Sequence, residues 1–233
     1  MKLGIVLRAF IPTVFFNFRY LPLKQALKLP VWIYKPHFVA LRGSVVIETS
    51  EISPGMIRLG FLTATTYPNS GISWNNEGRI IFKGKCVIGN NAFIVTGKQG
   101  TIEFGENFRS TTSLKIVSYT GIKFGKSVTL GWEVIVMDTN FHPLYDIEKK
   151  QFKKAYGKIL IGDYNWFSTQ CYILHSVHTP ERCVFGARSV LTRGENYAPY
   201  CVHGGCPVKI LSRNVICDMN KKLDYCEAII PHE

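Results

Sequence analysis

The sequence has no acidic residue before Glu48, whereas seven Lys and Arg side chains lie between Met1 and Ile47. The whole chain of 233 residues carries a formal net charge of +12. This imbalance favours an anionic partner, such as a phosphate-rich cofactor, a nucleic acid or an acidic lipid surface. No nucleic-acid-binding motif accompanies the charge, so we expect no nucleic-acid partner.

Long apolar runs are also missing, because no stretch reaches the roughly 18 apolar residues of a membrane-spanning helix. The basic N-terminal stretch is instead rich in aromatic residues, a combination typical of segments that rest on an anionic membrane face. We therefore expect a chain that is soluble or peripheral at the inner membrane face. The aromatic residues are Phe10, Phe15, Phe16, Phe18, Tyr20, Trp32 and Tyr34.

The seven cysteines show no CxxC spacing, which argues against a disulfide framework or a zinc cluster. A reducing cytoplasm is therefore the expected compartment. The apolar start of the chain is not expected to be a signal peptide, because Arg8 interrupts it and no small-residue cleavage site follows.

What the sequence does have is a period of six residues. Six positions at that spacing, starting at Ile161, include five apolar residues, and the residue four places after each of the first five is small or medium-sized. Neither a helix, with a period of about 3.6, nor an ordinary strand, with a period of about two, produces both rules. The first set is Ile161, Phe167, Ile173, Thr179, Phe185 and Leu191, and the second is Asn165, Cys171, Val177, Cys183 and Ser189.

A triangular prism produces both rules, because the first residue of each unit fills the interior and the fifth lies near a tight corner. Three units make a coil of eighteen residues, and coils stack through parallel backbone hydrogen bonds. An ordinary β-sandwich with chance spacing is the alternative. The same spacing recurs earlier in the chain, at Phe82, Ile88 and Ile94 (with Cys86 and Ala92) and at Phe124, Leu130 and Val136 (with Val128 and Val134). The phase of the repeat shifts between residues 94 and 124, so we expect bulges there.

Three regions surround or interrupt the predicted prism, which we place at residues 75–213. Residues 1–74 form an N-terminal basic and aromatic segment, in which prolines limit helices to short pieces such as Leu21–Leu29. Residues 138–158 break the period with a charged insertion, the kind of long loop that usually carries function. Residues 214–233 are a C-terminal tail, and a short cap or helix is expected after Val208.

Four features together resemble the hexapeptide-repeat acyltransferases. They are the hexapeptide run, the phrase Asp138-Thr-Asn-Phe-His142-Pro, the segment Ile161-Gly-Asp-Tyr-Asn-Trp166 and the segment Gly204-Gly-Cys-Pro-Val-Lys209. The likeness is greatest to the O-acetyltransferases of capsular and exopolysaccharide synthesis, which are related to maltose, galactoside and serine acetyltransferases. It implies an all-β chain, a left-handed parallel β-helix of about five coils with a protruding catalytic loop.

The resemblance implies transfer of an acetyl group from acetyl-CoA to a sugar hydroxyl of a polysaccharide or its lipid-linked precursor. It places His142 at the catalytic histidine, and an imidazole suits a general base because its ordinary pKa, about 6.5, is near working pH. Asp138, Asn140 and a backbone carbonyl are the candidates to orient its ring, and we favour Asp138. Trp132 and Asn140 are expected on the acceptor side, with core packing an equal alternative for Trp132.

The family's cofactor-contacting positions fall on Trp166, Thr169, Ala187 and Thr192 of this chain. Lys209 falls on a phosphate-binding position, Arg213 is its expected companion, and Arg193 is a further basic candidate. Ser168 and Arg188 stand where relatives usually have Gly, so the shape of the coenzyme groove differs here. The resemblance also implies a homotrimer, in which a neighbouring subunit closes the groove.

His175 and His178 have an HxxH spacing, but this does not match the histidine set of the zinc enzymes with this fold, so we expect no metal. His203 is expected to be structural. Two other functions stay open: an acyltransferase for a free sugar or other small acceptor, and a non-catalytic β-helix scaffold.

Overall fold

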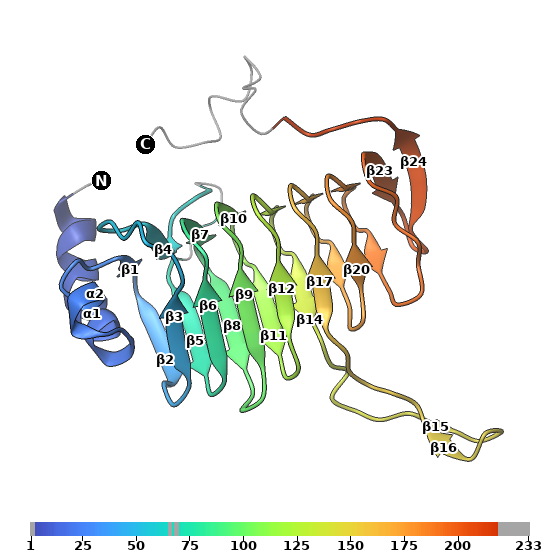
Figure 1. Ribbon diagram of the computed structural model, residues 1–233, viewed down its shortest axis with the longest axis horizontal. Coiled ribbons are helices and arrows are strands. Elements are labelled where there is room, and N and C mark those ends of the chain that lie inside the picture. Colours follow the sequence, from blue (N-terminus) through green and yellow to red (C-terminus); the bar gives the residue numbers. More distant parts are fainter. Residues whose placement is uncertain (1–2, 65–66, 68–69, 219–233) are drawn as a thin grey trace.

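The computed structural model describes residues 3–64, 67 and 70–218. Its coils stack side by side from β1 at one end to β23 and β24 at the other (Figure 1), with two helices at the β1 end. The helices are α1 Leu3–Tyr20 and α2 Leu23–Ala26. Most of the expected tail, 214–233, lies outside the described residues.

Three parallel sheets form the faces of the prism. The first contains β1 Val31–Ile33, β4 Ile57–Phe61, β7 Cys86–Gly89, β10 Phe108–Ser110, β13 Thr129–Leu130, β18 Trp166–Phe167, β21 Val184–Phe185, β23 Cys201–Gly204 and the antiparallel β24 Lys209–Arg213. The second contains β2 Pro36–Ala40, β5 Ile72–Asn76, β8 Ala92–Thr96, β11 Lys115–Ser118, β14 Ile135–Met137, β19 Tyr172–Ile173 and β22 Val190–Leu191. The third contains β3 Ser44–Ile47, β6 Arg79–Phe82, β9 Thr101–Phe104, β12 Ile122–Phe124, β17 Ile159–Ile161 and β20 His178–Thr179.

The register confirms the predicted coil. Trp166 pairs with Val184, Phe167 with Phe185 and Ile173 with Leu191, so partners are 18 residues apart in this region. All residues of the two predicted sets, large and small, are buried. The third sheet has six strands among the described residues, one for each complete coil, where about five coils were expected.

The core is one continuous column of side chains that runs the length of the prism. Phe82, Phe104 and Phe124 stack on one another at ring-centroid distances of 5.3 and 5.7 Å. Phe167 and Phe185 stack in the same way at 4.6 Å. This column explains the period, because each coil must offer a large apolar residue at the same inward position.

The corners are made by residues with left-handed backbone angles, and several of these have long side chains. Glu133, Gln170 and Arg188 have φ values of 59°, 57° and 59° at successive coils of one corner. The small residues predicted near the corners follow directly, at Val134, Cys171 and Ser189, and are buried. The long side chains fit because they point away from the core.

Helix α1 corrects the expectation that proline limits N-terminal helices to short pieces. It runs for 18 residues with Pro12 inside it. Pro12 removes one helical hydrogen bond, but Ala9, Phe16 and Asn17 are buried on the side of α1 that packs at the β1 end. This tertiary packing outweighs the local cost. The predicted helix at Leu21–Leu29 is confirmed in its centre, as α2.

Candidate active site

Residues 138–158, hereafter the protruding loop, leave the prism between β14 of the second sheet and β17 of the third. Figure 1 shows the loop extending well away from the stack, with the hairpin of β15 Tyr145–Asp146 and β16 Gln151–Phe152 at its far end. Its two limbs are joined near the prism, where Asn140 N donates to Ala155 O at 2.7 Å and Gly157 N donates to Asp138 O at 3.0 Å. The base of the loop is therefore closed.

Asp138 fixes that base from inside the protein. Its buried carboxylate accepts hydrogen bonds from the Ser118 hydroxyl (2.9 Å), the backbone N–H groups of Tyr119, Thr120 and Gly121 (2.7, 2.9 and 2.7 Å) and the Thr120 hydroxyl (3.0 Å). Among the described residues no hydrogen bond joins Asp138 to His142. Asp138 therefore anchors the base of the protruding loop. Its expected role in orienting His142 stays a prediction.

His142 is exposed, one residue after a turn in which Phe141 has a φ of 60°. Its backbone N donates to Asn140 O at 2.7 Å, and the Phe141 ring packs edge-on against Tyr119 at 5.2 Å. None of the described residues hydrogen-bonds its imidazole. The ring is therefore accessible to a substrate.

His175 lies beneath the loop, one coil further along. Its Nε2 is 3.3 Å from Asn140 Nδ2, and its Nδ1 is 3.3 Å from Ser176 Oγ. Burial, reinforced by the cations Arg193 and Lys154, lowers the pKa of His175. The lowered pKa favours the neutral ring, and in the tautomer with an unprotonated Nε2 the ring accepts the Asn140 N–H.

From its HxxH spacing His175 was considered only as a metal ligand, and its position beneath the loop was not predicted. The signal was present in the register, because Val136 pairs with Ile173 and Ile173 with Leu191. Continuing by two residues aligns Asp138, His175 and Arg193 in successive coils. Within the described part of the chain, no group of three His, Cys, Asp or Glu side chains could hold a metal ion.

The predicted acceptor residue Trp132 and several predicted cofactor residues lie at a different corner, between the first and second sheets. The Trp132 carbonyl accepts hydrogen bonds from Gln170 N at 2.7 Å and from the Thr169 hydroxyl at 3.1 Å. Thr169 O accepts from Arg188 N at 3.0 Å, next to the exposed Ala187. Trp166 is half-buried on β18 and begins this turn of the chain.

A polar chain that the sequence analysis missed runs along the same corner. Glu133 accepts hydrogen bonds from the Tyr67 hydroxyl at 2.8 Å and from Gln170 Nε2 at 2.6 Å, and Arg188 Nε donates to Gln170 Oε1 at 2.9 Å. The bonds from Gln170 and Tyr67 lower the pKa of Glu133, and the bond to Glu133 raises the pKa of Tyr67. The Tyr67 ring also packs edge-on against Trp132 at 5.9 Å.

The remaining predicted residues lie towards the end of the stack. Thr192 is exposed just after β22, and its carbonyl accepts a hydrogen bond from the Tyr197 hydroxyl at 3.3 Å. Lys209 and Arg213 are exposed at the two ends of β24. Within one chain, Trp132, Thr169 and Ala187 therefore lie at one corner of the prism. His142 lies on the protruding loop, which extends from a different corner.

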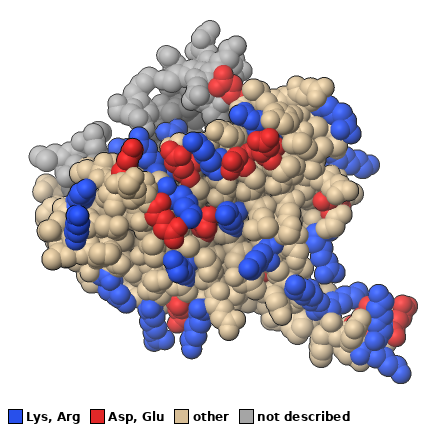
Figure 2. All heavy atoms as spheres, in the orientation of Figure 1, with Lys and Arg blue, Asp and Glu red and all other residues tan. Residues whose placement is uncertain are grey.

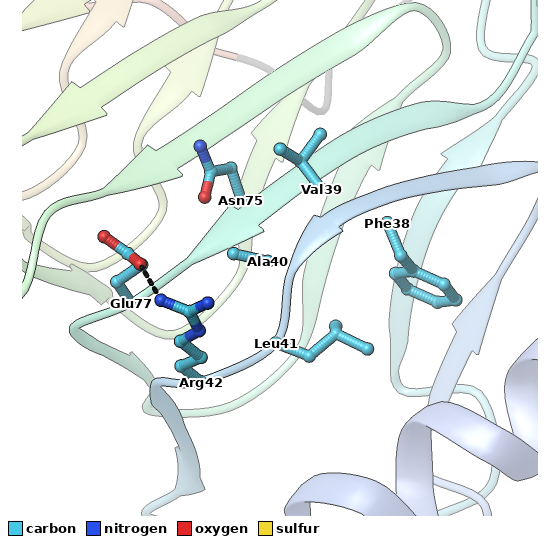
Figure 3. Close-up of a pocket in the computed structure, with 7 residues that line it drawn as sticks. All are labelled: Phe38, Val39, Ala40, Leu41, Arg42, Asn75 and Glu77. Atoms are coloured by element: carbon cyan, nitrogen blue, oxygen red, sulfur yellow. Dashed lines mark hydrogen bonds and ion pairs between the residues drawn. The ribbon is translucent and has the colours of Figure 1, made fainter.

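The surface also has a hollow at the opposite end of the prism, over the first coils of the second sheet. Figure 3 shows the ion pair on its rim, in which Arg42 Nη1 is 3.4 Å from Glu77 Oε1. No predicted site residue lines it. The lining residues are Phe38, Val39, Ala40, Leu41, Arg42, Asn75 and Glu77.

No protein-family model and no curated protein matches the sequence. Among solved structures, the chain is similar to the polysialic acid-specific acetyltransferase NeuO, with 18% identity over 84% of this chain and 90% of that chain, at a TM-score of 0.51. It is also similar to the polysialic acid O-acetyltransferase OatWY (18% identity, 82% and 92% covered, TM-score 0.47) and to galactoside acetyltransferase in complex with coenzyme A (17%, 92% and 84%, TM-score 0.42). The likeness to NeuO establishes the fold, and the predicted left-handed parallel β-helix is confirmed.

Proposed function

We propose that this chain is an acetyl-CoA-dependent O-acetyltransferase that modifies a sugar hydroxyl of a polysaccharide or its lipid-linked precursor. The observation that carries the proposal is the exposed His142, on a loop that interrupts the β-helix and is fixed at its base by buried Asp138. The likeness in fold to the polysialic acid-specific acetyltransferase supports it.

His142 would act as the general base. Its imidazole takes the proton of the acceptor hydroxyl as that oxygen becomes acetylated, and later gives the proton to the leaving sulfur. Bound acetyl-CoA would supply the acetyl group as a thioester and leave as free coenzyme A. The accessible ring supports this role, because a base must come within hydrogen-bond reach of the acceptor.

The coenzyme would lie along Trp166, Thr169, Ala187 and Thr192, with its phosphates near Lys209 and Arg213. Exposed cations at the end of the stack fit a ligand that carries several phosphate charges. Trp132 and Asn140 would contact the acceptor.

A homotrimer is part of the proposal. In one chain His142 and the corner of Thr169 and Ala187 are on different edges of the prism, so a second chain would have to bring them together. The proposal also includes a cytoplasmic location with the N-terminal segment at the anionic inner face of the membrane, which its basic and aromatic composition supports.

The test is release of free coenzyme A from acetyl-CoA in the presence of candidate glycans, with mass spectrometry of the products. His142→Ala is expected to lower kcat by about 10²- to 10⁴-fold, the usual contribution of a general base, while coenzyme A binding persists. His37→Ala, an exposed histidine on β2 of the first coil, is the matched control and should keep full activity. A wild-type protein that neither binds coenzyme A nor consumes acetyl-CoA would refute the proposal.

A further inference from the structure

Helix α1 turns both apolar and polar side chains towards the prism, and large apolar side chains outward. Its inner face includes the buried polar residues Thr13 and Asn17. Asn17 Nδ2 donates to Val31 O at 2.7 Å, Val31 N donates to Asn17 Oδ1 at 3.2 Å, and Ile33 N donates to Thr13 Oγ1 at 3.1 Å. These side chains face inward because they satisfy the backbone of β1 at the open end of the prism.

The outer face of α1 is apolar. Five large residues are 47–77% exposed, and at about 100° per residue they fall within an arc of about 140°. Two similarly exposed leucines, one on α2 at 65% and one directly after it at 67%, extend the set. We call these residues the outer patch: Leu7, Phe10, Ile11, Phe15, Phe18, Leu23 and Leu27. A contiguous exposed apolar set of this kind marks an interaction surface.

Cations border the outer patch, and neither α1 nor α2 contains a carboxylate. Arg8 lies beside it on α1, Arg19 donates a hydrogen bond to Leu41 O near the end of the helix, and Lys24 and Lys28 are exposed on and next to α2. None of the four forms a salt bridge with a described residue. Figure 2 shows Lys and Arg side chains at this end of the molecule, and in the sequence the first carboxylate is Glu48.

We propose that the outer patch binds an anionic lipid bilayer, with α1 lying in the interface. A helix with an apolar face and cations along its border is suited to this position. None of the described helices is long and apolar enough to cross a membrane. A second copy of the patch fits less well, since it would bring like charges together with no carboxylate between them.

The experiment is sedimentation of the full-length protein with vesicles of phosphatidylcholine, alone or mixed two-to-one with phosphatidylglycerol. The wild type is expected to bind the mixed vesicles. The double variant Phe10→Ser/Phe18→Ser should lower the partition constant about 10-fold or more, with an unchanged melting temperature because both rings are exposed. Phe152→Ser, an equally exposed phenylalanine on β16, should bind like the wild type.

A charge arm tests the lipid class. Lys24→Glu/Lys28→Glu should weaken binding to the mixed vesicles about 10-fold or more, whereas Lys149→Glu/Lys150→Glu, on the distant hairpin, should have little effect. The proposal is overturned if the wild type ignores the mixed vesicles or if the phenylalanine pair binds like the wild type. It is also overturned if Phe10→Ser/Phe18→Ser leaves vesicle binding unchanged but lowers the mass of the protein assembly in sedimentation velocity. That result would identify a second copy of the chain as the occupant of the outer patch. This inference gives the proposed membrane contact a defined surface. Vesicle binding needs no acetyl transfer, so a failure here would leave the proposed acetyltransferase activity standing.

Discussion

Asn140 Nδ2 and His175 Nε2 lie 3.3 Å apart and join the protruding loop to the next coil of the prism. The two residues are 35 positions apart in sequence, and the coil register brings them together. Their contact ties the segment that carries His142 to the rigid stack, so His175 is a positioning residue for that segment.

His175→Ala is therefore expected to loosen the loop and to lower kcat on the order of 10-fold, as small misplacements of a catalytic group do. Amide hydrogen exchange at residues 139–143 should become faster in the variant. His175→Gln, whose amide oxygen can accept from Asn140, should restore much of both. His178→Ala, the exposed histidine three residues on, is the control, and unchanged exchange in His175→Ala would contradict this role.

Asp138→Asn should destabilise the fold, because the amide group must face a backbone or hydroxyl donor where the carboxylate accepted one. The expected loss in the free energy of unfolding is about 2–3 kcal/mol, measured by chemical denaturation. Asp163→Asn should lose less, since Asp163 is exposed and its carboxylate accepts one backbone bond, from Lys126 N at 2.7 Å. Unchanged stability with a large loss of kcat would instead favour the predicted partnership with His142.

The proposed trimer predicts complementation between two inactive variants. If each site takes His142 from one chain and Trp166 from the next, refolding His142→Ala and Trp166→Ala chains together in equal amounts should restore about one quarter of wild-type activity, by random assembly of a three-chain ring. The variants assayed separately should stay inactive. An inactive mixture of proven mixed trimers would show that both residues act within one chain.

The buried His203 is expected to lower the free energy of unfolding in acid. Its ring is buried, stacks on Phe185 at 5.0 Å, and accepts the Ala198 N–H at Nε2 at 3.2 Å. Burial lowers the pKa of His203 in the folded state, so above the ordinary value of about 6.5 both states are neutral and nothing is lost. Below it the unfolded chain binds the proton first, and the free energy of unfolding falls as the pH approaches the folded-state pKa.

The measurement is the melting temperature between pH 7.5 and pH 5. The fall on acidification should shrink in His203→Phe, which keeps an aromatic ring beside Phe185. Part of the fall should remain, because burial also lowers the pKa of His175. The exposed His37→Phe is the control and should leave the pH dependence as in the wild type.

The sequence predicted the later coils well and the first ones poorly, for a physical reason. Between Trp166 and Val184 each coil has 18 residues, so the inward positions recur at fixed spacing. In the first coils the spacing between partners is wider: Val31 pairs with Ile57, and Ile57 with Cys86. Longer turns there conceal the period, and the stack therefore begins at Val31, well before residue 75.

The site was predicted unevenly for a related reason. A motif identifies residues close in sequence, so His142 and Asp138 were found together, but it does not reveal what lies one coil away. His175 and the chain from Tyr67 through Glu133 to Gln170 depend on register and on a loop from an early coil. Once the coil register is known, it predicts the position of His175 next to Asn140. The polar chain depends on the position of the Tyr67 side chain, which no repeat or motif in the sequence indicates.

The hydrogen bonds between β1 and the Thr13 and Asn17 side chains prevent a strand of another molecule from pairing with β1. A parallel stack whose end strands were bare would accept another molecule's end strand, and repeated addition would produce a fibre. Here side chains of α1 occupy backbone groups of β1 at one end, and at the other β24 runs antiparallel to β23, opposite to the direction of the stack. These two closures keep both ends of the first sheet from adding a strand of another molecule.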